Sequence, residues 1–311
     1  MKDRFTVFVA LFGFFHLFVQ LRRLAGLCFR HLIKSSTSDM NQYKSNHSAS
    51  TWAIVTGGSD GIGLAIAKEL AIDHGFNICI ISRNEDKIIK CLEEIKAASE
   101  VETLCVVADL GKLSTLTDYQ VLLRENGLDE LDVGVLVLNA GLCDISPFRL
   151  QAKGNIQSMM GVNLLHVIFL TKVLLPQLVK REARSAILTI GSGIRAIPAP
   201  GLNLYSSTKE FVYYFSRSVG YELASKNIDV LCFEPGSVDT KMTKEQEGGK
   251  KQTPAEVSLI GLRDLSKNRS NYYNYVSQGS FLGEFAQHWI FPLFPIDLIQ
   301  GLMFKSIWNS K

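Results

Sequence analysis

Short apolar runs alternate with longer helical stretches through the central part of the chain. The apolar runs lie near residues 52–56, 77–82, 103–108, 133–138, 186–190 and 229–233, and a seventh is expected from Tyr272 to Val276. Continuous apolar runs of this length, separated by helices, are typical of buried parallel strands. The pattern therefore predicts an α/β fold, in which a doubly wound parallel sheet is covered by helices on both faces as three layers.

Two long apolar helices are expected in the second half of this region. They extend over about Asn155–Lys180 and Asn203–Ser225 and should pack side by side on one face of the sheet. Pro176 should kink or end the first helix, because proline lacks the backbone N–H that a helix interior requires.

The chain ends have a different character from the centre. Residues from Phe5 to Leu21 are almost wholly apolar and are followed by Arg22 and Arg23. A helix over this run reaches about 25 Å, the short limit for a membrane span, so it either spans a bilayer or lies on its surface. A cleaved signal peptide is the competing interpretation. If the run is an anchor, the positive charge that follows it favours a cytosolic location for the rest of the chain.

These patterns divide the chain into four parts. They are a hydrophobic membrane anchor at 1–34, a polar linker at 35–50, the α/β domain at 51–280, and a hydrophobic C-terminal extension at 281–311. Pro292 and Pro295 interrupt the extension, so it is expected to form interfacial helices, a lid near a substrate pocket or a buried helix.

Composition excludes several classes of function. The 33 basic and 30 acidic residues give a net charge of only +3, so no nucleic-acid partner is expected. The six cysteines form no C-x-x-C pair and the six histidines do not cluster. We therefore expect no metal site and no disulfide framework, and a reducing compartment is favoured.

A glycine-rich turn joins the first apolar run to a helix. The run ends at Thr56, and the residues that follow are Gly57, Gly58, Ser59, Asp60, Gly61, Ile62 and Gly63. Glycines let a backbone approach a pyrophosphate closely, and the N–H groups and dipole of a helix start attract its charge. The turn therefore predicts a dinucleotide site.

Three further residues suggest proton transfer. If Tyr205 lies on a helix, Lys209 at i+4 projects from the same face, where an ammonium favours the phenolate and lowers the tyrosine pKa. Ser192 follows the fifth apolar run, so its hydroxyl should emerge at the carboxyl edge of the sheet. Tyr205 is then a candidate acid, and Ser192 a neutral hydrogen-bonding partner.

From Trp52 to Val276 the chain resembles the short-chain dehydrogenase/reductase family, which has a Rossmann-type sheet. The turn matches the family's Thr-Gly-x-x-x-Gly-x-Gly pattern at Thr56, Gly57, Gly61 and Gly63. The resemblance implies a catalytic tetrad of Asn163, Ser192, Tyr205 and Lys209, in which Asn163 holds a water relay. It also implies further cofactor contacts at Asp109, Leu110, Asn139, Ala140, Gly141, Pro235, Gly236, Val238 and Thr240.

Several short sequence segments are similar to those of one branch of this family, the 17β-hydroxysteroid dehydrogenases and very-long-chain 3-oxoacyl-CoA reductases. The matching segments are Ile81–Asn84, Tyr205–Lys209, Phe211–Arg217 and Thr240–Thr243. The chain departs from the branch at Gly191, where a second serine is frequent, and around Asn139. Neither departure removes a reacting group, so they affect the assignment of the substrate and not that of the chemistry.

The cofactor is expected to be NADP(H). Where NAD enzymes of this fold place an acidic residue after the second strand, this chain has Ser82 and Arg83. A planar guanidinium suits a 2′-phosphate. The alternative is that Arg83 only flanks the loop and that Glu85 or Asp86 binds the ribose.

The resemblance implies an NADPH-dependent reductase of the endoplasmic-reticulum membrane, with its catalytic domain facing the cytosol. Its substrate would be a hydrophobic ketone, either a long-chain 3-oxoacyl-CoA or a 17-ketosteroid. A retinoid or general carbonyl reductase is the alternative, and a silent nucleotide-binding scaffold is a further one. Lys241, Lys244, Lys250 and Lys251 either attract CoA phosphates or are simply solvated. A homodimer is possible for this family.

Overall fold

The chain forms two compact units. The computed structural model describes residues 2–32, 39–45, 51–243, 251–267, 276–279, 281–298 and 300–301. One unit comprises residues 1–36 and 280–293, and the other comprises 37–279 and 294–311.

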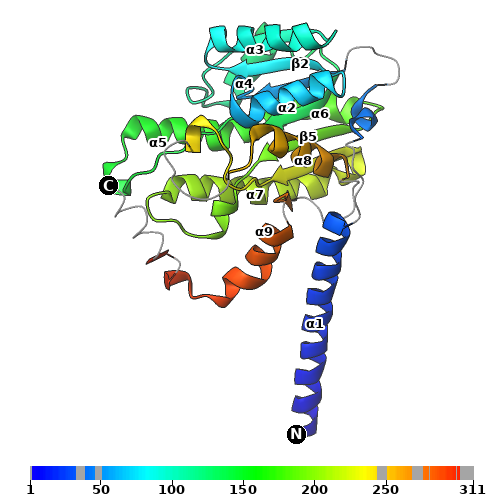
Figure 1. Ribbon diagram of the computed structural model, residues 1–311, viewed down its shortest axis with the longest axis vertical. Coiled ribbons are helices and arrows are strands. Elements are labelled where there is room, and N and C mark those ends of the chain that lie inside the picture. The colour runs from blue at the N-terminus through cyan, green and yellow to red at the C-terminus, as the bar shows by residue number, and fades with distance from the viewer. Residues whose placement is uncertain are drawn as a thin grey trace. The chain divides into compact units, whose positions relative to one another are not determined.

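The larger unit is built on a seven-stranded parallel sheet, which confirms the predicted fold class (Figure 1). The strands are β1 (Trp52–Thr56), β2 (Asn77–Ser82), β3 (Thr103–Val107), β4 (Val133–Leu138), β5 (Ser185–Ile190), β6 (Ile228–Phe233) and β7 (Val276–Ser277). Their spatial order is β3-β2-β1-β4-β5-β6-β7. The order reverses direction at β1 and β4, and a doubly wound sheet binds ligands at such a switch point. Most of the predicted seventh strand, Tyr272–Tyr275, lies outside the described residues.

Helices cover both faces of the sheet. Alternate residues of β1 point to opposite sides: Ala53 and Val55 into one apolar core, Trp52 and Ile54 into the other. The first core is covered by α2 (Gly61–Ile72), α3 (Glu85–Ala98) and α8 (Pro254–Ser266). The second is covered by α4 (Leu116–Glu125), α6 (His166–Lys180) and α7 (Asn203–Leu223).

The first predicted long helix differs from expectation at two points. It consists of α5 (Lys153–Met160), a π-helical turn η3 (Gly161–Leu165) and α6. Pro176 does not end it, because α6 continues to Lys180. The irregularity falls instead at η3, which lies beside α7.

The predicted polar linker at 35–50 is wrong over part of its length. Residues Met40–Tyr43 form a 3₁₀ turn, η1, in which Met40 and Tyr43 are fully buried in the first core. The Tyr43 hydroxyl donates to Asp229 Oδ2 at 3.0 Å and to the Leu265 carbonyl at 3.1 Å. These contacts make η1 part of the α/β unit.

The smaller unit contains the N-terminal helix and part of the C-terminal extension. Helix α1 extends over Lys2–Leu32 and exposes all of its side chains from Arg4 to Phe18. Its segment Arg4–Cys28 is long and apolar enough to cross a membrane. At 25 residues this segment is roughly 37 Å long, more than the ~30 Å hydrocarbon core.

The described part of the extension consists of short helical turns. They are α9 (Phe281–Phe285), the π-helical turn η7 (Ala286–Ile290) and the 3₁₀ turn η8 (Phe291–Leu293). The rings of Phe285 and Trp289 stack with centroids 5.2 Å apart. Residues 302–311, the end of the predicted extension, lie outside the described residues.

Candidate active site

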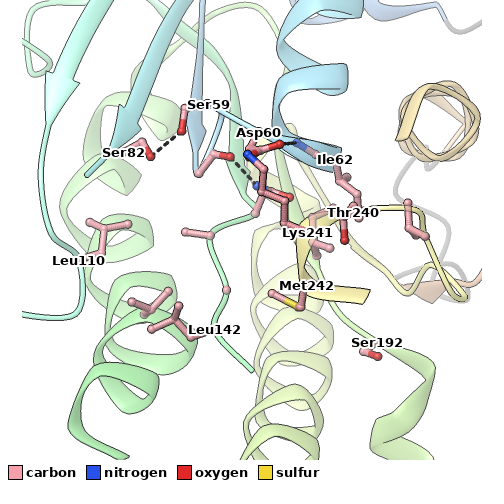
Figure 2. Close-up of a pocket in the computed structure, with 18 of the residues that line it drawn as sticks. Ser59, Asp60, Ile62, Ser82, Leu110, Leu142, Ser192, Thr240, Lys241 and Met242 are labelled. Carbon is pink, nitrogen blue, oxygen red and sulfur yellow. Dashed lines mark hydrogen bonds and ion pairs between the residues drawn. The ribbon is translucent and has the colours of Figure 1, made fainter. Parts of the chain in front are cut away.

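A cavity of about 460 Å³ opens at the carboxyl edge of the sheet, between the glycine turn and α7 (Figure 2). Gly57 and Gly61 both have positive φ, at 65° and 54°, which a side chain would strain. Gly57, Ser59, Asp60, Gly61 and Ile62 all line the cavity.

Hydrogen bonds between Thr56 and Asn139 fix the glycine turn to the end of the neighbouring strand β4. The Thr56 hydroxyl accepts hydrogen bonds from the backbone N–H groups of Asn139 and Ala140 at 3.0 and 3.1 Å. The Asn139 amide donates to the Thr56 and Gly57 carbonyls. Gly63 does not line the cavity; a side chain there would collide with Asn139 and Gly57. The turn therefore leaves a backbone cradle, and its residues fit the pyrophosphate of a dinucleotide.

Two positively charged side chains, Arg83 and Lys87, line the cavity near the end of β2. Ser82, Arg83, Asn84 and Lys87 line the cavity, and the hydroxyls of Ser59 and Ser82 lie 2.9 Å apart (Figure 2). Glu85 and Asp86 are in the first turn of α3 and are not among the described lining residues. Sequence reasoning missed Lys87, although its spacing from Arg83 by one helical turn is visible in the sequence.

The segment after the third strand contributes Ala108 and Leu110 to the cavity wall. Asp109 does not line the cavity. The Asp109 carboxylate accepts a hydrogen bond from the Gly111 N–H at 3.1 Å. Its side chain stabilises the turn after β3, and its contact with the adenine stays a prediction.

Ser192, Tyr205 and Lys209 come together at the other end of the cavity. Ser192 follows β5 and begins the 3₁₀ turn η4 (Gly193–Ala196). Tyr205 and Lys209 lie one turn apart on α7, with the Lys209 ammonium 5.6 Å from the Tyr205 ring centroid. Lys209 Nζ also donates to the Ile190 carbonyl at 2.8 Å.

The expected lowering of the tyrosine pKa is wrong for the protein alone. Burial raises the pKa of Tyr205 to about 12, the neighbouring Cys143 adds to this, and a hydrogen bond with Ser192 opposes it. Burial also lowers the pKa of Lys209 to about 8. For both groups burial has the largest effect on the pKa, because the charged form is poorly solvated where α7 holds these side chains.

Asn163 lies behind the cavity rather than in its wall. It is buried in η3, where its Oδ1 accepts from the Leu142 N–H and its Nδ2 donates to the Leu142 carbonyl and Thr208 hydroxyl. These contacts hold the segment that carries Gly141 and Leu142, both of which line the cavity.

The segment after β6 closes the cavity on its third side. Pro235, Gly236, Val238 and Thr240 line it. Lys241, in the 3₁₀ turn η6 (Lys241–Thr243), forms an ion pair with Asp60 of the glycine turn (Figure 2). Lys251 donates to the Thr243 carbonyl at 2.6 Å. Lys244 and Lys250 lie outside the described residues.

A family model described as short chain dehydrogenase matches residues 51–251. The chain belongs to the short-chain dehydrogenase family. It is 34% identical over 265 residues to a very-long-chain 3-oxoacyl-CoA reductase of Anas platyrhynchos, a match that covers 82% of this chain and 79% of that one. It is also 34% identical over 251 residues to the human inactive hydroxysteroid dehydrogenase-like protein 1, covering 77% of this chain and 73% of that one.

Solved structures of other short-chain dehydrogenases share the fold. A short-chain dehydrogenase from Sphingobium yanoikuyae in complex with NADPH has a TM-score of 0.67 at 23% identity, covering 81% of this chain and 95% of that one. A 3-ketoacyl-(acyl-carrier-protein) reductase from Brucella melitensis complexed with NADH has a TM-score of 0.63 at 24% identity, covering 74% and 97%. The family match and the similarity to very-long-chain 3-oxoacyl-CoA reductases make this chain an oxidoreductase that acts on C=O or CH–OH groups.

One feature of this site escaped sequence reasoning. Glu234 directly follows β6 and is paired with Arg195 of η4 below the Ser192 turn. An acidic residue at the end of a continuous apolar run is visible in the sequence, but its partner is 39 residues away. Only the fold brings the two together.

Proposed function

We propose that the protein reduces the ketone of a long-chain 3-oxoacyl-CoA with NADPH. The observation that carries the proposal is a single cavity that joins the glycine cradle to Ser192, Tyr205 and Lys209. The similarity to very-long-chain 3-oxoacyl-CoA reductases favours this substrate over a 17-ketosteroid, a retinoid or a general ketone.

The bound cofactor supplies hydride to the carbonyl carbon. Ser192 then donates a hydrogen bond to the carbonyl oxygen, and Tyr205 transfers its phenolic proton to the oxygen as negative charge develops there. Burial keeps the Tyr205 pKa near 12, so the phenol is protonated at neutral pH and ready to donate. Lys209 lies beside the ring and favours the phenolate that results. Asn163 orders the Leu142 segment and is proposed to anchor the reprotonation relay.

NADPH is favoured over NADH by the charges at the end of β2. Arg83 and Lys87 line the cavity there, and no acidic side chain of the described β2–α3 junction does. A 2′-phosphate would meet cations, whereas a 2′-hydroxyl would find no carboxylate partner there.

Helix α1 is proposed to anchor the protein in the endoplasmic-reticulum membrane with the α/β unit in the cytosol. Its exposed apolar surface and the arginines that follow Leu21 support this placement. A homodimer through the α7 face, which exposes Tyr214 and Tyr221, is also proposed.

The test is NADPH oxidation by the full chain reconstituted in vesicles, with a long-chain 3-oxoacyl-CoA, a 17-ketosteroid and a retinal compared at equal concentration. The 3-oxoacyl-CoA should be turned over most efficiently. Preference for either other substrate would assign the reductase to that class.

A silent nucleotide-binding protein is the second candidate, since one relative is named as inactive. The presence of Ser192, Tyr205 and Lys209 around one cavity favours turnover. Tight NADPH binding without oxidation of any of the three substrates would support the silent protein instead.

A further inference from the structure

A buried arginine lies directly behind the catalytic serine. Arg195 belongs to η4, three residues after Ser192, and its side chain is only 9% exposed. Its Nε donates to Glu234 Oε1, and one terminal nitrogen donates to Glu210 Oε2 at 3.1 Å. The guanidinium carbon lies 3.4 Å from the centroid of the Tyr213 ring, a cation–π contact.

Its partner Glu234 is completely buried. Glu234 lies between β6 and Pro235, and its backbone N–H donates to the Ser277 carbonyl at 2.7 Å. The second carboxylate oxygen accepts from Gln278 Nε2 at 3.4 Å. Both carboxylate oxygens therefore have partners, as a buried charge requires.

Gly191 provides the space for this carboxylate. A Cβ at position 191 would lie 2.9 Å from both Glu234 Cγ and Cys232 Sγ, closer than atoms pack. The absence of a side chain at Gly191 thus leaves room for both Glu234 and Cys232. Gly191, which precedes the catalytic serine, therefore packs directly against the Arg195–Glu234 pair.

The pair links the three segments that carry the site. Arg195 is on the Ser192 turn, Glu210 follows Lys209 on α7, and Glu234 precedes the Pro235–Gly236 wall. A buried ion pair contributes little net stability relative to apolar residues of the same volume, so stability alone does not account for it. A planar guanidinium that bridges two carboxylates does, however, fix the orientation of the segments that it connects.

We propose that Arg195 and Glu234 are positioning residues that hold Ser192 against Tyr205 and place a negative charge near Lys209. This rests on the reductase function proposed above. The groups that face Lys209 are Cys143, Cys232 and Glu234, and those that face Glu234 are Arg195, Glu210 and Cys232. Burial lowers the pKa of Lys209, and Cys232, Cys143 and the ionised Glu234 carboxylate oppose this effect. Burial also raises the pKa of Glu234 itself to about 7, and the pairing with Arg195 opposes that rise and so favours the ionised carboxylate. Neutralising Glu234 should therefore make Lys209 lose its proton at lower pH.

The experiment compares Glu234→Gln with Asp229→Asn in the full chain. Asp229 is a matched control: it is buried at the opposite end of the same strand and is paired with Arg184 at 2.6 Å. Both variants remove a buried carboxylate charge from β6, and both should lower the melting temperature. Only Glu234→Gln should change the catalytic site.

For Glu234→Gln we expect kcat to fall by about 10²-fold, the usual effect of a catalytic group misplaced by about 1 Å. NADPH affinity should stay within about twofold because the cradle is untouched, a change of under ~0.5 kcal/mol. The alkaline limb of the kcat–pH profile should move to lower pH. Asp229→Asn should change neither kcat nor the limb. If Glu234→Gln loses stability but keeps its kcat and pH profile, the pair is only structural and the proposal fails.

A second readout does not depend on activity. Hydrogen exchange of the amides in Gly191–Ala196 should accelerate in Glu234→Gln and not in Asp229→Asn, even if the unaltered chain reduces no substrate. Unchanged exchange there would overturn the positioning role, whereas an inactive chain with accelerated exchange would overturn only the proposed function. If Glu234→Gln does not fold, Arg195→Lys gives the same test, because lysine keeps the charge but lacks the planar fork.

Discussion

Tyr205 and Lys209 show that burial can outweigh a neighbouring charge. A phenol with a pKa near 12 and an ammonium with a pKa near 8 are both shifted toward their neutral forms. A protonated phenol is the state that reduction requires, since the proton must be delivered as hydride arrives.

The Tyr205→Phe variant should lose ketone reduction while retaining NADPH binding. The substitution deletes only the phenolic oxygen, so the ring still packs, but the developing alkoxide has no proton donor. Loss of general acid catalysis is typically worth about 10²–10⁴ in rate. Steady-state turnover and NADPH fluorescence titration measure the two effects. Retention of more than about a tenth of turnover, against that expected loss, would assign the proton to another group.

The Arg83→Asp variant should weaken NADPH binding and spare NADH. The change removes a partner of the 2′-phosphate and adds a repulsive charge, and hydrogen bonds to charged groups are worth about 1.5–3 kcal/mol. The ratio of kcat/KM for the two cofactors should shift by at least about tenfold. Glu85→Gln is the control, because Glu85 does not line the cavity. A preference of the unaltered chain for NADH would refute the cofactor assignment.

At the scale of elements, η1 belongs with the sheet and not with the anchor. Met40 and Tyr43 are buried in the first core, and Arg181 Nη2 donates to the Tyr43 carbonyl at 2.9 Å. The boundary of the folded unit therefore precedes residue 40.

Removal of residues 1–38 should leave a folded α/β unit that no longer pellets with membranes after a salt wash. Removal of residues 1–45 should destabilise the unit, because it also takes away Met40 and Tyr43 from the core. Sedimentation and thermal unfolding of the two truncations give the comparison. Continued pelleting of the shorter truncation would move the anchor to the C-terminal segment, and equal stability of both would show that η1 is dispensable.

Within η1, Tyr43→Phe should lower the free energy of unfolding by about 1–3 kcal/mol, the cost of leaving a buried polar partner unsatisfied. The hydroxyl donates to the Asp229 carboxylate and to the Leu265 carbonyl, both inside the unit. Tyr214→Phe on the exposed face of α7 is the control and should be nearly neutral. Urea unfolding followed by circular dichroism measures the difference; equal midpoints would refute the role of the hydroxyl.

At the scale of the whole molecule, the second core holds α6 against the sheet, and His166 at the start of α6 is fully buried. Burial lowers the pKa of His166 to about 3. Between pH ~6.5 and pH ~3 the His166 side chain binds a proton in the unfolded chain but not in the native protein. This contribution to stability is therefore complete above pH ~6.5 and is lost as the pH falls.

His166→Gln should consequently flatten the decline in melting temperature between about pH 6.5 and 4. The comparison is of slopes, so a constant loss of stability in the variant does not obscure it. His16→Gln is the control, since His16 is exposed on α1. An unchanged slope in His166→Gln would show that acid destabilisation arises from other groups.

The elements and the main reacting groups were predictable because they depend on neighbours in the chain. Apolar runs located the first six strands to within a residue or so, since a strand buried on both faces must be apolar throughout. The glycine turn and the Tyr205–Lys209 spacing likewise encode local geometry: positive φ in one, a shared helix face in the other.

What only the tertiary structure decided depends on contacts between distant segments. The turn η1 is buried by α8 and β6. Arg195, which follows β5, meets Glu234, which follows the neighbouring strand β6. The sign of the Tyr205 pKa shift belongs here too, because desolvation is set by everything packed around a group and not by its neighbours in sequence. Sequence periodicity determines which faces are buried; the folded packing determines how dry, and how charged, each site becomes.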